Sequence, residues 1–83
     1  MIQTIDELLH RLRAGRSLAE ITVYGVNLAG HNFGKAKLSG VRLLECVLSG
    51  TDFIEADLSG AVFSNCVIHG ADFRNANLRQ AMM

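Results

Sequence analysis

The sequence predicts an all-β solenoid built on a five-residue repeat, with an α-helix covering its N-terminal end. From residue 21 onward every fifth residue is large and apolar, and similar quintets return after twenty residues. An α-helix repeats every 3.6 residues and a strand every two, so a strict period of five indicates a chain that turns a corner every five residues. Residues 1–20 instead show the apolar spacing of an amphipathic helix.

The five-residue period is the stronger of the two repeats. Twelve consecutive quintets carry a large apolar residue at their centre: Val23, Leu28, Phe33, Leu38, Leu43, Leu48, Phe53, Leu58, Phe63, Ile68, Phe73 and Leu78. Scattered at random, hydrophobic residues would give such a run in one frame roughly once in five thousand trials. Two positions earlier the residue is mostly small, as at Cys46, Thr51 and Ala56. We therefore expect two residues of each quintet to point inward and three outward.

The twenty-residue period predicts how the quintets stack. The segment 46–50 (Cys-Val-Leu-Ser-Gly) returns as 66–70 (Cys-Val-Ile-His-Gly), and phenylalanine recurs at Phe33, Phe53 and Phe73. Like residues stack because successive coils lie one strand spacing apart, about 4.8 Å. The expected coils are residues 21–40, 41–60 and 61–80. Three such coils give a stack about 15 Å tall, with an interior filled by side chains.

Three quintets, 56–60, 71–75 and 76–80, closely follow the order small residue, Asp or Asn, Leu or Phe, and two polar residues. This pattern resembles the pentapeptide-repeat family, and the resemblance extends over residues 21–83. It implies a right-handed quadrilateral β-helix with four quintets per coil and about three coils in this chain.

The first twenty residues predict a helix that covers the first coil. Apolar residues follow the spacing i, i+3, i+4, i+7 from Ile5 to Leu12. Thr4 and Glu7 fit a capping box, and Gly15 is a suitable C-terminal stop. The expected domains are a capping helix and linker at 1–20 and the β-helix at 21–83. A helix that binds a partner on its own is the alternative.

Composition narrows the classes of partner. Eight basic and eight acidic residues cancel, which argues against a nucleic-acid or membrane-surface binder. No apolar run approaches the roughly 18 residues needed to cross a bilayer, and no signal-peptide pattern begins the chain. We therefore expect a cytoplasmic protein, with export without a cleaved signal peptide as the open alternative.

Residues that could carry chemistry are few. Cys46 and Cys66 are expected to be inward thiols one coil apart, because parallel side chains are poorly placed for a disulfide. The histidines lack metal-site spacing, and His31 is expected in a small inward slot near the capping helix. Asp52 and Asp72 should stack on one convex face, which cannot exclude water. We therefore expect no catalytic residue, no metal, no cofactor and no enzymatic activity.

Large apolar residues at outward positions form the candidate interface. Val47 and Val67 should share one side of the coil, and Leu44 and Val62 the adjoining side. The complete candidate set is Tyr24, Leu44, Val47, Val62, Val67, Met82 and Met83. A contiguous patch of this kind usually marks a protein interface, whereas isolated apolar residues are ordinary on any surface.

Two functions follow from these features. The first is a rigid protein-interaction module that forms a homodimer, end-on through the C-terminal coil or through the apolar face, or binds a protein partner. A bacterial effector or accessory protein is one setting that the resemblance implies. The alternative, also implied by the resemblance, is a DNA-mimicking modulator of DNA gyrase or topoisomerase. Charge weighs against mimicry, because about 15 Å of duplex carries about nine negative charges, and the repeat region is neutral, with five acidic and five basic residues.

Overall fold

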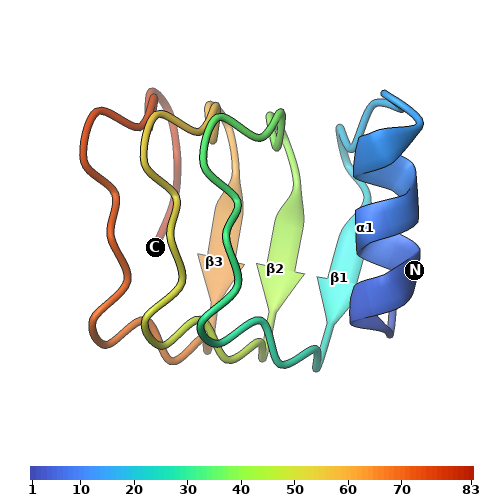
Figure 1. The fold of residues 1–83 in the computed structure, drawn as a ribbon, viewed down its shortest axis with the longest axis horizontal. Coiled ribbons are helices and arrows are strands. Elements are labelled where there is room, and N and C mark those ends of the chain that lie inside the picture. Colours follow the sequence, from blue (N-terminus) through green and yellow to red (C-terminus); the bar gives the residue numbers. More distant parts are fainter.

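The computed structural model describes all 83 residues, which form one helix and a parallel sheet of three short strands (Figure 1). The elements are α1 (Ile5–Arg13), β1 (Thr22–Tyr24), β2 (Arg42–Leu44) and β3 (Val62–Ser64). The strand order is β1-β2-β3, and Val23 pairs with Leu43, which pairs with Phe63. Each strand thus returns to the same register after twenty residues, as the sequence period predicts.

The other three sides of the coil keep the same register through single parallel bridges. These bridges join Asn27, Val47 and Val67 on one side, Asn32, Asp52 and Asp72 on the next, and Lys37, Asp57 and Asn77 on the last. The chain therefore advances by one strand spacing for every twenty residues, and its outline in Figure 1 is a stack of similar loops.

Corners fall at every fifth residue. The backbone has positive φ at each fifth position from residue 20 to residue 80, at six glycines and seven other residues. The seven are Glu, Lys, Asn or Gln, with no β-branched residue among them, because branching at Cβ makes this conformation costly. Glycine is required most clearly at Gly40, where φ is 73° and an added Cβ would lie 3.1 Å from the Cα of Ala19.

The interior is filled by the central residues of the quintets. Phe33 and Phe53 stack with ring centroids 5.9 Å apart, and Phe53 and Phe73 with centroids 5.2 Å apart. Buried Thr51 satisfies its hydroxyl by donating a hydrogen bond to the carbonyl oxygen of Leu28 over 2.8 Å. A void lined by apolar core side chains has a volume of only about 10 Å³, which is too small for a ligand.

Helix α1 lies beside β1 at the N-terminal end of the stack (Figure 1). The Thr4 hydroxyl accepts a hydrogen bond from Glu7 N–H over 3.2 Å, which satisfies one free donor of the first turn. At the other end Gly15 has φ of 69°, and its N–H donates to the carbonyl oxygen of Leu12. The helix buries Leu8 in the core cluster. It is too short and too polar to cross a membrane.

Two N-terminal residues join the core without having been expected there. Ile2 is fully buried and pairs with β1: its N–H donates to the carbonyl oxygen of Thr22, and its carbonyl oxygen accepts from Tyr24 N–H. Leu18 is also buried, and it precedes Val23 by five residues, so it continues the series of central residues. The inward register therefore reaches further toward the N-terminus than residue 21.

Candidate protein-interaction surfaces

Four of the predicted interface residues come together around one corner of the coil. Tyr24 pairs in register with Leu44 across β1 and β2, and Val47 bridges to Val67 on the adjoining side. Leu44 and Val47 are separated along the chain by the corner residue Glu45 and by Cys46. Tyr24 and Val67 are 40% and 52% exposed, and the other two side chains are half-buried. We call Tyr24, Leu44, Val47 and Val67 the corner patch.

The remaining predicted residues lie apart from this patch. Val62 bridges to Met82, but its partner in β2 is the charged Arg42. Leu44 is in register with Ser64 instead. The seven candidates therefore form two groups, with the strongly exposed Met82 and Met83 at the C-terminal end of the stack.

A hydrogen bond orders the aromatic member of the corner patch. The Tyr24 hydroxyl donates to Glu45 Oε2 over 2.9 Å. This hydrogen bond and the negative charge of Glu45 raise the pKa of Tyr24 above its ordinary value, so the phenol stays neutral. A ring held in one position loses less conformational entropy on binding than a free one.

The coil of residues 61–80 presents a second candidate surface, the edge that faces away from β2. Within the stack, Leu48 N–H donates to Val67 C=O over 2.7 Å and Phe53 N–H to Asp72 C=O over 2.8 Å. The equivalent N–H groups of Ile68 and Phe73 form no hydrogen bond, and the Ile68 side chain is 38% exposed. We call this row of free backbone groups and apolar side chains the terminal edge.

The stacked carboxylates are occupied by their own turns. Asp52 accepts a hydrogen bond from Ile54 N–H over 2.8 Å, and Asp57 accepts from both the N–H and the hydroxyl of Ser59. The Ser59 hydrogen bonds lower the pKa of Asp57. The hydrogen bonds and charge of Arg74 likewise lower the pKa of Asp72. These residues stabilise corners, in keeping with their regular spacing.

The cysteines are free thiols, as expected, but His31 is not in the inward position predicted for it. Cys46 is buried, its thiol donates to the carbonyl oxygen of Val23, and burial raises the pKa of that thiol. The expectation that His31 fills an inward slot near the helix is wrong: its side chain is exposed, and its Nδ1 lies 3.3 Å from the carbonyl oxygen of Ala29. Thr51 and Ala71 occupy the equivalent positions of the next two coils, and Thr51 is fully buried.

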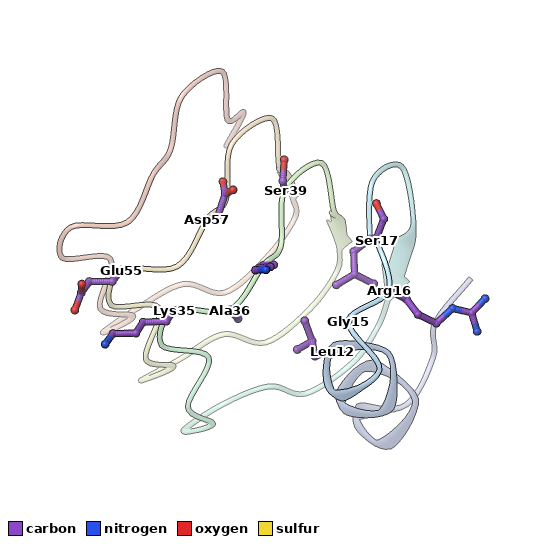
Figure 2. A pocket seen from close by; sticks show the side chains of 11 residues that line it. Leu12, Gly15, Arg16, Ser17, Lys35, Ala36, Ser39, Glu55 and Asp57 are labelled. Atoms are coloured by element: carbon purple, nitrogen blue, oxygen red, sulfur yellow. The ribbon is translucent and has the colours of Figure 1, made fainter.

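A groove between the linker after α1 and one side of the coil is a third surface, which no sequence feature predicts (Figure 2). Residues from 12–18 form one wall, and residues from 35–39, together with Glu55 and Asp57, form the other. Its volume is about 760 Å³. We call it the linker groove. It exists because the linker leaves the twenty-residue register, and no motif in the sequence marks such a departure.

Comparison with known proteins agrees with the geometry. The sequence profile described as pentapeptide repeats matches eight copies, over residues 17–53 and 42–80. The structure is similar to that of QnrB1, a plasmid-mediated fluoroquinolone resistance protein, with a TM-score of 0.57 and 20% sequence identity. That likeness covers 98% of this chain and 58% of the QnrB1 chain, so this chain spans little more than half of that protein. No curated protein sequence matches this chain significantly.

These findings establish the fold as a right-handed β-helix. They also confirm the resemblance drawn from the quintets, since the family's repeats account for nearly all of the coil. With its repeats matched from residue 17 to residue 80, this chain belongs to the pentapeptide-repeat family.

Proposed function

We propose that the protein is a non-enzymatic interaction module, a rigid platform that presents the corner patch to a second copy of itself or to a protein partner. The observation that carries this proposal is the grouping of Tyr24, Leu44, Val47 and Val67 at outward positions, where pentapeptide repeats normally carry polar residues. Burial of apolar surface contributes about 25 cal/mol per Å², so four large side chains are a substantial part of an interface.

The surroundings of the corner patch suit an interface. Glu45 and Arg42 are charged and exposed beside it, and a polar rim around an apolar centre is typical of protein contacts. Tyrosine is enriched among the residues that dominate binding energy. Tyr24, held by Glu45, therefore suits the centre of such a contact.

The terminal edge is the second contact surface that we propose, used end-on between two copies about a two-fold axis. Met82 and Met83 lie there and are 65% and 64% exposed. In this proposal α1 covers the opposite end of a stack of three coils, so that residues 1–20 act as the cover and residues 21–83 as the platform. We propose that the protein acts in the bacterial cytoplasm as an accessory or effector protein.

Replacing both Val47 and Val67 with aspartate is the direct test of the corner patch. Both side chains point outward, so circular dichroism and the unfolding midpoint should change little. Self-association measured by light scattering, or capture of the partner in a pull-down, should be lost, because desolvating two carboxylates in an apolar contact costs several kcal/mol.

The matched control places the same two charges nearby but outside the patch. Ser49 and His69 follow Val47 and Val67 on the same side of the coil, so Ser49→Asp with His69→Asp should leave association intact. An unchanged mass and an unchanged pull-down in the valine double variant would contradict the role of the corner patch.

The second candidate function is modulation of DNA gyrase or topoisomerase by DNA mimicry. The observation in its favour is the shared fold with a fluoroquinolone resistance protein. The neutral balance of the repeat region weighs against it, because duplex DNA of equal length carries about nine negative charges. A gyrase supercoiling assay decides: inhibition or protection at micromolar protein would support mimicry, and the absence of any effect would remove it.

A further inference from the structure

The linker groove contains an interrupted β-ladder. Asp57 has both backbone groups paired: its N–H donates to Ala36 C=O over 2.9 Å, and its C=O accepts from Leu38 N–H over 2.8 Å. Lys37 is the bridge partner of Asp57 on the N-terminal side, yet its own N–H and C=O form no hydrogen bond. If the ladder continued with the same twenty-residue step, residues 16–18 would pair with the N–H and C=O of Lys37. Instead, this segment forms the opposite wall of the groove.

The same groove holds side-chain cations without partners. Lys35, Lys37 and Arg16 line it, and none of them takes part in either ion pair of the structure. Figure 2 shows Lys35 beside Glu55 at one edge, whereas the Arg16 side chain extends from the linker away from the coil. Asp57, the second acidic residue in the groove, already accepts hydrogen bonds within its own turn. With three cations against two carboxylates, the lining carries a net charge of +1 next to a free strand edge.

These features select one class of ligand. A free N–H and a free C=O on one residue match the alternating donor and acceptor of an extended peptide backbone. A phosphate or an isolated carboxylate supplies acceptors alone and would leave Lys37 C=O unpaired. The volume of about 760 Å³ lies within the roughly 300 to 1,000 Å³ of typical ligand sites. An extended residue rises about 3.3 Å, so a few residues suffice to pass Lys37.

We propose that the linker groove binds an extended acidic peptide segment of a partner protein. The segment adds a short strand along Lys37 and places its carboxylates beside the ammonium groups of Lys35 and Lys37. This inference rests on the proposed function as an interaction module and adds a second surface, separate from the corner patch, with a partner of defined chemistry.

Binding of a labelled peptide tests the proposal. The probe is a fluorescein-labelled octapeptide of alternating glutamate and threonine, and the reference peptide alternates lysine and threonine. Fluorescence anisotropy should show binding of the acidic peptide alone, weakened by added salt. Lys37→Glu should weaken binding at least tenfold. Arg79→Glu, the same charge reversal on the same side of the coil but outside the groove, should leave it unchanged.

Amide hydrogen exchange tests the strand pairing. Lys37 N–H should exchange at least tenfold more slowly when the acidic peptide is bound, whereas Asp57 N–H, already paired, should not change. The proposal is overturned if the acidic peptide fails to bind at millimolar concentration, if both peptides bind equally, or if Lys37→Glu has no effect. Unchanged Lys37 exchange in the complex, with competition by inorganic polyphosphate, would identify a general anion site and also overturn it.

The groove and the corner patch can fail independently. The double variant Val47→Asp with Val67→Asp leaves the groove untouched, so it should bind the acidic peptide as the natural protein does. Loss of self-association or partner capture in that variant, together with a failure of the natural protein to bind the peptide, would support the proposed function and overturn this inference alone.

Discussion

Replacing Phe53 with alanine is expected to lower the free energy of unfolding by about 3 to 5 kcal/mol. Phe53 is 1% exposed, and its ring lies between those of Phe33 and Phe73. The substitution removes a large buried side chain and leaves a cavity that the two neighbouring rings can fill only in part. Urea unfolding followed by circular dichroism measures the change, with an unaltered slope indicating that the same surface is exposed.

Phe73→Ala is the matched control for this substitution. Phe73 belongs to the same column but is half-buried, with another ring of the column on one side only. Phe73→Ala creates less buried cavity surface, so it should lower the free energy of unfolding clearly less than Phe53→Ala does. Equal costs for the two variants, or a cost below about 1 kcal/mol for Phe53→Ala, would contradict the described packing.

Replacing Leu8 with alanine is expected to cost about 2 to 5 kcal/mol. Leu8 is 1% exposed and is the one helix residue that is fully buried in the core cluster. It contacts the same small void as Leu28, Phe33 and Phe53, so its removal enlarges an existing defect. Because Leu8 belongs to the same core cluster as the coil residues, the helix and the β-helix should unfold in one cooperative transition.

His10→Ala is the control on the exposed side of α1, and it should change stability by no more than about 0.5 kcal/mol. Two separate transitions for the Leu8→Ala variant, one for loss of the helix and a later one at the natural midpoint, would contradict the account. That result would mean that the coil is stable without its cover.

Most of the fold could be predicted because inward positions are visible in the sequence. Each central residue meets its equivalent twenty positions later, so the requirement for a large apolar side chain recurs at a fixed interval, as at Phe33, Phe53 and Phe73. The corner glycines Gly30 and Gly50 recur for the same reason, since both have positive φ. A requirement that recurs at the same place in every coil therefore produces a periodic signal in the sequence.

The structural features that the sequence did not predict occur only once, so they produce no periodic signal. Ile2 pairs with β1 as a single residue, and nothing before it repeats. Leu18 does fit the five-residue series, but the small residue two positions before it is replaced by Arg16. His31 stands at an inward position by count, yet its side chain is exposed and its Nδ1 lies 3.3 Å from the Ala29 carbonyl oxygen.

Among the candidate surfaces too, those built from repeat positions could be predicted and the linker groove could not. Outward apolar residues such as Val47 and Val67 could be placed on one side by counting. Counting by fives also put Val62 on the side of Leu44, and the strand register pairs Val62 with Arg42 and Leu44 with Ser64. The linker groove depends on the path of residues 16–18, which no repeat governs.

An experimental structure, by crystallography or NMR, tests the central claim most directly. The claim is that two residues in five point inward and that four straight segments close one rung of twenty residues. The account predicts that the rings of Phe33, Phe53 and Phe73 form a single column, with neighbouring centroids 5.9 Å and 5.2 Å apart. A structure in which any of these three rings lies outside that column would contradict it.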